Sequence, residues 1–239
     1  MLLLSLAAAG FFFAGIYAIL IKSNQWAGGT SVEDYRTIRG TATGEYEEKK
    51  SRFIAQLSFA DSEEKAVAFL EQVRAANRTA RHNVYAYRLR EGNRERYSDD
   101  GEPAKTAGTP ALEVLQHSGL TDLIVVVTRY FGGVLLGTGG LVRAYTQAVK
   151  EGLDHCETGI MRKGCELEVT TDYNDVGKLQ YYFGQQGIVP ADSIYAENVK
   201  FILLVPVEKE DGLRKNLTET TCGKVKIEKL KETYFIDKE

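Results

Sequence analysis

Residues 123–145 read LIVVVTRYFGGVLLGTGGLVRAY and contain the strongest structural signals of the chain. The stretch begins with a continuous aliphatic and β-branched run, Leu123–Thr128, which is typical of a central strand buried on both faces. A glycine-rich segment follows at residues 132–140, and the apolar spacing then becomes helical over Gly140–Leu153. The order predicts a buried strand, a glycine-rich loop and a helix.

The glycine-rich loop is the first candidate binding site. Glycines allow backbone N–H groups to approach a ligand, and the helix N-terminus that follows favours an anion. Arginines before and after the loop would fit a phosphate or a nucleic-acid backbone. The loop matches neither a Walker A motif nor a dinucleotide fingerprint, so tight turns and close helix–strand packing stay open as the alternative. The candidate residues are Arg129, Tyr130, Gly132, Gly133, Gly137, Gly139, Gly140 and Arg143.

The second candidate is a turn in the segment YSDDGEPAKTAGTP, residues 97–110. Asp99, Asp100 and Glu102 place three carboxylates within four residues, which is enough to hold a divalent metal or share a proton. However, the pairs Asp100-Gly101 and Glu102-Pro103 are primarily signals of a turn. Thr106 is also placed to cap a helix over Ala107–Ser118. Without further ligands nearby, a structural turn is the favoured interpretation, and no metal is expected.

A third candidate is a cluster of seven arginines between residues 74 and 96. This window contains only two acidic residues, Glu91 and Glu95. Interleaved tyrosines would stack on bases in a nucleic-acid site, although a solvated strand edge carries the same pattern. Arg81, His82 and Arg88 are the candidate residues, beside an expected strand at Asn83–Leu89. A structural role for His82 is the alternative.

Composition limits the function classes. The chain has 239 residues with 30 Lys+Arg against 33 Asp+Glu, a net charge of −3, so only a local basic patch can bind nucleic acid. Three cysteines without CxxC spacing argue against a disulfide scaffold or a zinc finger and favour a reducing compartment. Neither a serine elbow nor histidine pairs with ligand spacing occur, so catalysis has little support and no cofactor is expected.

The remaining segments indicate two α+β domains. Upstream of the central strand we expect extended segments at Tyr35–Tyr46 and Ser51–Phe59 and a helix beginning at residues 61–64. Downstream, a βαββαβ order is the ferredoxin-like arrangement. The expected domains cover residues 32–158 and 165–239, joined near Gly159–Gly164. The downstream elements are Glu166–Thr171, Tyr173–Gln186 closed by Gly187, Ile188–Tyr195, Val199–Val205, Lys209–Thr220 and Val225–Glu232.

The N-terminal residues 1–31 differ from the rest. Leu2–Ile21 is an uncharged run long enough for a transmembrane helix, and the first cations follow it, which predicts an N-terminus outside and the domains in the cytoplasm. A start-site artefact is an equal alternative, with the protein beginning at Val32 and no contact with a membrane. A cleaved signal peptide is less favoured, because no basic residue precedes the run.

Four stretches of the chain resemble the IMPACT family, in particular its bacterial two-domain members of the YigZ type. The resemblance extends from about Tyr35 to the C-terminus and excludes the N-terminal run. Lys105 departs from it, because many members have a small residue there. The stretches are Arg81–Tyr87, Ser98–Pro103, Thr106–Pro110 and Val125–Tyr145.

The resemblance implies a fold and a function. The first domain is expected to be like the second domain of a small-subunit ribosomal protein, a βαβ fold shared with elongation factor G, and the second like the C-terminal ferredoxin-like domain of that factor. Eukaryotic relatives regulate translation by competing for an activator of a stress kinase, a role that depends on a different N-terminal domain.

We therefore expect a non-catalytic protein that binds RNA or the ribosome, with a regulatory protein as a further partner. One alternative is an enzyme for a phosphorylated or nucleotide substrate, which needs the acidic turn and the glycine-rich loop to share one pocket. Another is a protein-interaction module.

Overall fold

The structure is a computed structural model and describes residues 34–238. It divides into two compact units. The larger unit holds described residues up to Gly164 together with the last residues of the chain from Tyr234, and the smaller unit holds Cys165–Thr233. The apolar run Leu2–Ile21 lies outside the described residues. Between residues 34 and 238, the helices are too short or too polar to cross a membrane.

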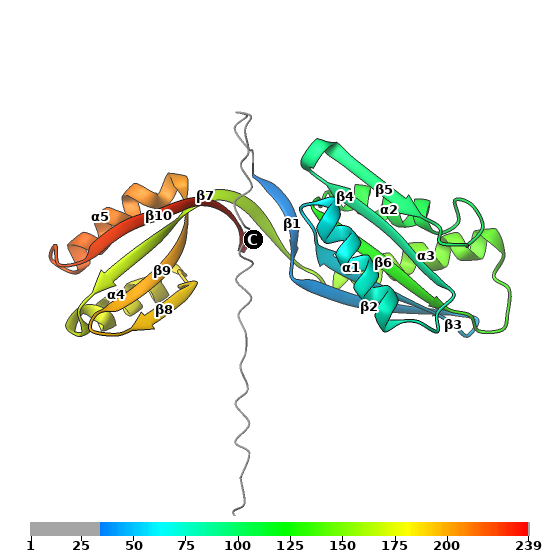
Figure 1. Ribbon diagram of the computed structural model, residues 1–239, viewed down its shortest axis with the longest axis horizontal. Helices are drawn as coiled ribbons and strands as arrows, with labels where there is room; N and C mark the ends of the chain where they lie inside the picture. Colours follow the sequence, from blue (N-terminus) through cyan, green and yellow to red (C-terminus); the bar gives the residue numbers. More distant parts are fainter. Residues whose placement is uncertain (1–33, 239) are drawn as a thin grey trace, which may run out of the picture. The chain divides into compact units, whose positions relative to one another are not determined.

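A five-stranded sheet forms the centre of the larger unit, in the order β2-β3-β6-β4-β5 (Figure 1). All neighbouring strands of known register are antiparallel. The expectation that Leu123–Thr128 is a central buried strand is confirmed, since β6 lies between β3 and β4 and its first seven residues are buried. The strands are β2 (Thr41–Glu48), β3 (Ser51–Phe59), β4 (His82–Leu89), β5 (Arg94–Ser98) and β6 (Leu123–Tyr130).

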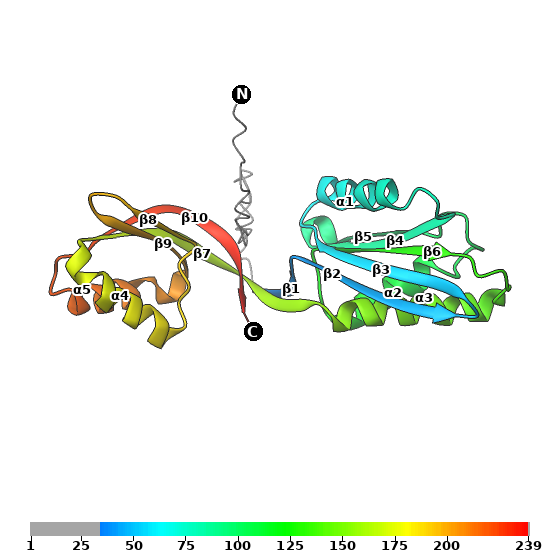
Figure 2. The ribbon, with the colours of Figure 1, turned by 90° about the horizontal axis from the view of Figure 1, so that it is seen from below.

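Three helices cover the two faces of this sheet. Helix α1 (Glu63–Ala76) lies on one face, and α2 (Gly108–Ser118) and α3 (Gly137–Asp154) lie on the other (Figure 2). Successive side chains of β6 point to opposite faces of the sheet, which explains why helices cover both faces. Ile124 and Val126 pack in the cluster with α1, so their odd-numbered neighbours face α2 and α3. The three helices thereby bury their apolar sides against the two faces of one sheet, α2 mainly against β4 and β5 and α3 mainly against β2 and β3.

A close approach of backbones brings α3 against β2. A methyl group added at Gly44 of β2 would lie 2.3 Å from the backbone nitrogen of Gly152 in α3, well inside van der Waals contact. Glycine at this crossing therefore allows the helix to lie directly on the strand. This contact fixes the direction in which α3 leaves the glycine-rich loop.

The smaller unit has the βαββαβ order that the sequence predicts. Its strands pair in the order β10-β7-β9-β8, and this confirms the ferredoxin-like fold. Asp172 caps α4 by accepting from Asn174 and Asp175 N–H groups, and Gly187 ends it with a φ of +65°. The elements are β7 (Glu157–Thr171), α4 (Tyr173–Gln186), β8 (Asp192–Tyr195), β9 (Val199–Pro206), α5 (Glu210–Thr220) and β10 (Lys226–Lys238).

Several boundaries differ from the sequence-based prediction. The expected junction at Gly159–Gly164 lies within β7, whose first residues pair with β1 (Tyr35–Arg39) in the register Tyr35↔Met161 to Arg39↔Glu157. Glycine signals a turn locally, but here a partner strand from the start of the described chain satisfies its backbone groups. Similarly, α3 begins at Gly137 instead of Gly140, and β10 continues past Glu232.

Candidate functional site

Four connections meet at one end of the larger unit's sheet. The register pairs Arg52 with Tyr130 and His82 with Arg129, so β3 and β4 begin where β6 ends. We call this region the loop end of the sheet. It contains the β2–β3 turn (residues 49–50), the α1–β4 connection (77–81), the acidic turn (99–106) and the β6–α3 loop (131–136).

A cavity of about 430 Å³ opens at the loop end, and we call it the loop-end cavity. It brings together five candidates that the sequence places up to about sixty residues apart: Arg81 and His82 of the basic cluster, Glu102 of the acidic turn, and Arg129 and Gly137 of the glycine-rich segment. The lining residues are Arg81, His82, Glu102, Pro103, Arg129, Phe131, Leu135, Leu136, Gly137, Thr138 and Leu141.

A buried ion pair forms one wall of the loop-end cavity. The side chains of Arg129 and Glu102 are only 7% and 4% exposed, and Arg129 Nη1 donates to Glu102 Oε1 at 2.6 Å. The Tyr145 hydroxyl donates to the same oxygen at 2.8 Å. Burial first, and then the charge of Glu102, raises the pKa of Tyr145 far above its usual range. The hydroxyl therefore remains protonated and stays a donor.

The Arg129 guanidinium also lies close to two aromatic rings. Its central carbon is 5.3 Å from the ring centroid of Phe53 and 5.6 Å from that of Phe131, distances at which a cation is attracted to the ring face. The Nε atom of Arg129 is buried and has no hydrogen-bond partner within the described part of the chain. One donor of this side chain is therefore unused.

The carboxylate of Asp99 stabilises the start of α2. It accepts from the backbone N–H groups of Lys105 at 2.9 Å, Ala107 at 3.1 Å and Gly108 at 2.8 Å. The expectation that Thr106 caps α2 is wrong, because its hydroxyl donates instead to the Pro103 carbonyl at 2.7 Å. Asp99, eight residues before the N-cap residue Ala107, takes the place of a local cap. The residues next to the start of the helix do not reveal this partner.

Asp100 joins the acidic turn to β4. Its carboxylate accepts the Asn83 N–H at 2.6 Å and contacts Arg74 Nη2 at 3.2 Å. Its backbone carbonyl lies 2.8 Å from Nδ1 of His82, which places the proton of the neutral ring on Nδ1. The next residue, Gly101, has a φ of +87° and completes the turn. All three carboxylates of the acidic turn thus have partners within the protein, and residues 34–238 contain no grouping of acidic, His and Cys side chains fit for a metal.

The glycine-rich loop serves packing at one end and leaves donors free at the other. The Gly132 N–H donates to Ser51 Oγ at 3.1 Å, and a methyl group at Gly132 would lie 2.1 Å from the Lys50 carbonyl carbon. By contrast, no side chain caps the N-terminus of α3, which begins at Gly137 after Leu136. The first N–H groups of an α-helix have no partner inside the helix, and here they lie at the cavity.

Gly133, Gly139 and Gly140 have different surroundings. Gly133 has a φ of +87°, and a methyl group there would meet nothing. Gly139 and Gly140 follow in the first turn of α3, and neither lines the loop-end cavity. The glycine-rich loop therefore contributes Gly137 alone among its glycines to the cavity wall.

The predicted site residues Tyr130 and Arg143 lie away from the loop-end cavity. Tyr130 faces α1 and donates to Asn77 Oδ1 at 2.9 Å. Arg143 lines a separate hollow with Tyr46 and Glu48, because it lies two residues, about 200° of helical rotation, from Tyr145. Arg129 and Arg143 thus do not form one site.

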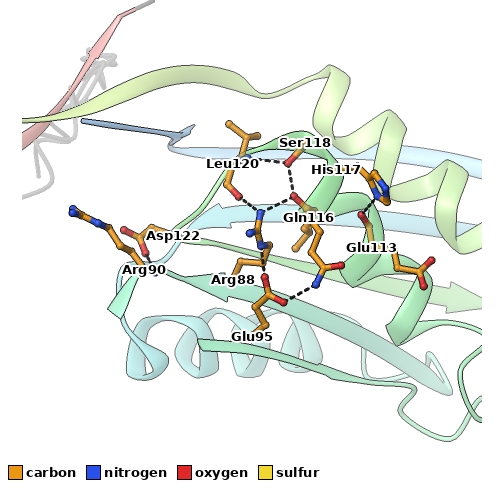
Figure 3. A network of polar contacts seen from close by, with 10 residues as sticks. Arg88, Arg90, Glu95, Glu113, Gln116, His117, Ser118, Leu120 and Asp122 are labelled. Atoms are coloured by element: carbon orange, nitrogen blue, oxygen red, sulfur yellow. Dashed lines mark hydrogen bonds and ion pairs between the residues drawn. The ribbon is translucent and has the colours of Figure 1, made fainter. Parts of the chain in front are cut away.

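Arg88 has a structural role (Figure 3). Its Nε pairs with Glu95 at 2.7 Å, and its Nη1 donates to the carbonyls of Leu120 at 2.9 Å and Leu115 at 3.2 Å. These bonds join β4 to β5 and to the end of α2. The guanidinium is therefore occupied and does not extend an anion site.

Most of the arginine cluster is neutralised by carboxylates from elsewhere in the larger unit. Glu63 of α1 pairs with both Arg94 and Arg96, and Arg74 pairs with Glu71 and Asp100. Within the described residues, five exposed cations of the loop end have no ion pair, and we call them the loop-end cations. They are Lys49, Lys50, Arg78, Arg81 and Lys105.

Comparisons with known proteins agree on one family. Residues 49–153 match the Impact N-terminal domain, and residues 169–224 match a domain of unknown function, DUF1949. The chain is 37% identical over 208 residues to IMPACT family member YvyE of Bacillus subtilis, covering 85% of this chain and 94% of that one. It is 35% identical to IMPACT family member YigZ of Escherichia coli, covering 77% and 92%. A crystal structure of a hypothetical protein with 33% identity covers 84% of this chain and 98% of that one, with a TM-score of 0.55.

Proposed function

Because the chain belongs to the IMPACT family, we propose that it is a non-catalytic protein that binds RNA or a ribosomal surface through its loop end and thereby modulates translation. The loop-end cations supply the attraction, and the exposed ring of Phe131 supplies a face on which a base can stack. This proposal moves the binding surface from the arginine cluster as a whole to Arg78 and Arg81, its two members at the loop end, together with three lysines.

The convergence of unpaired cations is the observation that carries the proposal. The protein as a whole has a net charge of −3, so a general electrostatic attraction to nucleic acid is absent. Cations that already have a carboxylate partner gain little from a phosphate, because they must give up the existing pair. The loop-end cations have no such cost, and three connections of the fold bring them to the same end of one sheet.

The acidic turn supports binding over catalysis. An enzyme for a phosphorylated substrate needs a carboxylate that is free to take a proton or to hold a metal. The glycine-rich segment and Glu102 do share one cavity, as that alternative requires. However, the carboxylate of Glu102 is held by Arg129 and Tyr145, and those of Asp99 and Asp100 accept backbone N–H groups.

The salt dependence of RNA binding tests the proposal. We expect the affinity of the full chain for a labelled single-stranded RNA to fall steeply with salt, measured by fluorescence anisotropy. Each lost phosphate contact reduces the slope of log K against log salt by about 0.7 on single strands. The variant Lys49→Ala/Lys50→Ala/Arg78→Ala/Arg81→Ala should therefore have a slope smaller by up to about 3.

Two results would contradict this function. The first is binding that does not depend on salt, which excludes a phosphate-based interface. The second is an unchanged slope in the four-residue variant, which would place the contacts on another surface. Circular dichroism of the variant is the control for folding, since all four side chains are exposed.

A further inference from the structure

We propose that two copies of this chain associate through the outer edge of β8, so that the sheets of their smaller units join into one continuous antiparallel sheet. The pairing is symmetric and centred on Ile194, and it brings α4 of one copy beside α4 of the other. This interface lies in the smaller unit and uses none of the loop-end cations, which belong to the larger unit.

Strand β8 (Asp192–Tyr195) has an open edge. It pairs with β9 on one side, and no strand of residues 34–238 pairs with its other side. An open edge presents backbone N–H and C=O groups to another chain, and natural proteins protect such edges with charged side chains, proline or bulges. The other edge strands of the described chain, β1, β2, β5 and β10, each contain at least two charged residues. Strand β8 reads DSIY, and its one charged residue, Asp192, is at its first position.

Apolar side chains are exposed on both faces of the sheet at this edge. Tyr195 pairs with Val199 of the core, so it lies on the face that α4 and α5 cover, and Ile194 lies on the opposite face (Figure 2). Tyr195 is 57% exposed and Ile194 is 45% exposed, and Val189 just before the strand is 80% exposed. A strand added at the edge would remove part of this apolar surface from water.

A flank of α4 beside β8 contains two glycines that no contact within the described chain requires. The Tyr173 hydroxyl donates to the Ala196 carbonyl at 2.8 Å, and Gln180 Nε2 lies 3.5 Å from the Tyr195 hydroxyl. A methyl group at either glycine would meet no atom within 4 Å, although glycine destabilises a helix interior relative to alanine. Glycine does allow a second helix to approach closely. The flank consists of Tyr173, Gly177, Gln180 and Gly184, at helical spacing.

These two features together favour a second copy of the chain over an extended peptide. A peptide strand would pair with β8 but would leave the flank of α4 uncovered. A symmetric pair of copies related by a two-fold axis perpendicular to the sheet keeps the helices of both copies on one face. The flank of α4 in one copy then lies next to the same flank in the other. A second copy therefore accounts for both the open edge and the glycines.

The sequence of β8 is complementary to itself when the two-fold axis passes at Ile194. Ile194 then lies opposite Ile194 of the second copy, Ser193 opposite Tyr195, and Asp192 opposite Ala196. Directly opposite side chains contact each other, and like charges directly opposite are destabilising. This register pairs an apolar residue with itself and places no like charges opposite. A register centred on Ser193 places Asp192 opposite Ile194, and one centred on Asp192 places two carboxylates opposite each other.

Sedimentation equilibrium of the full chain at increasing concentration tests the association. We expect a monomer–dimer equilibrium that Ile194→Lys weakens about tenfold or more, because it places two ammonium groups opposite each other at the centre of the interface. Leu230→Lys is the matched control, since Leu230 is 48% exposed on β10, another edge strand. The control should stay within about threefold of the unaltered protein. Circular dichroism of both variants checks that they fold.

Two outcomes of this measurement would overturn the proposal. One is an unaltered protein that stays monomeric at every concentration. The other is a dimer that Ile194→Lys weakens no more than Leu230→Lys does, which would place the interface elsewhere in the chain.

Cysteine substitutions test the register. Ile194→Cys places two thiols opposite each other at the axis, where Cα atoms about 4.5–5.5 Å apart are within the span of a disulfide. Asp192→Cys places them four residues apart along the strands, about 13 Å, which is too far. Mild oxidation should therefore give a covalent dimer with Ile194→Cys and no more with Asp192→Cys than with the unaltered protein, whose Cys222 is exposed. Equal amounts of covalent dimer with both substitutions would contradict the register and the interface.

Substitutions in the helices separate loss of the interface from loss of the fold. Gly177→Gln/Gly184→Gln adds side chains where the chain itself leaves space, so the melting temperature of the dilute protein should be unchanged or higher. The same side chains would lie between the two α4 helices, and the dimer should be weakened about tenfold or more. Gly212→Gln in α5 is the control, since a methyl group there also meets nothing, and it should change the affinity less than about threefold. A dimer of unaltered affinity in the α4 variant would contradict the proposal.

Discussion

Replacing Glu102 with alanine is expected to lower the free energy of unfolding of the larger unit by about 3–5 kcal/mol. The substitution leaves the Arg129 guanidinium buried without its counter-charge, and it removes the acceptor of the buried Tyr145 hydroxyl. An uncompensated buried charge is among the most costly changes in a protein interior. Urea denaturation followed by circular dichroism measures the effect.

Two controls identify the buried charge as the cause. Glu71→Ala removes an exposed partner of Arg74 and should cost less than about 1 kcal/mol. The double variant Glu102→Ala/Arg129→Met leaves no charge in the wall and should recover a large part of the stability lost in Glu102→Ala. If Glu102→Ala costs no more than Glu71→Ala, the ion pair does not have the role described.

Replacing Gly132 with alanine should destabilise the larger unit by about 1–3 kcal/mol. The new methyl group would lie 2.1 Å from the carbonyl carbon of Lys50 and 2.4 Å from the nitrogen of Ser51. Both are backbone atoms, which do not move aside as the end of a flexible side chain does. The β2–β3 turn would have to shift, and the hydrogen bond from Gly132 to Ser51 Oγ would be strained. Thermal and urea unfolding measure the loss.

A second glycine of the same loop is the matched control. At Gly139 a methyl group would meet only the end of the Arg143 side chain, at 3.7 Å, and the backbone has no positive φ. Gly139→Ala should therefore be neutral or stabilise by up to about 1 kcal/mol, since alanine favours a helix. Equal destabilisation by both substitutions would mean that the close approach at Gly132 is not what the glycine provides.

Much of the fold can be predicted from the sequence, because its strongest signals are local. The run Leu123–Thr128 predicts a central strand, and Gly187 predicts the end of α4. The strand β5 has no such signal, since its residues RERYS lie exposed at the edge of the sheet and are held by pairing with β4. The first half of β7 depends likewise on a distant partner, β1.

The site was predictable in its parts but not in its combination. Sequence patterns identify the glycine-rich loop and the acidic turn, and the strand register places both at one end of the sheet. Which arginine is neutralised depends on carboxylates brought by other elements, such as Glu63 of α1 for Arg94. Spacing along the chain does not contain that information. The lysines of the β2–β3 turn become candidates only when the loop end is assembled.

The measurement that tests the central claim most directly is ribosome binding by two matched variants of the full chain, at low and at moderate salt. Arg78→Ala/Arg81→Ala removes two loop-end cations, and Arg94→Ala/Arg96→Ala removes two arginines that Glu63 already neutralises. Both change the net charge equally. The account predicts that cosedimentation with ribosomes is weakened strongly in the first variant and little in the second. Equal binding by both variants, or no binding by the unaltered protein at either salt, would contradict it.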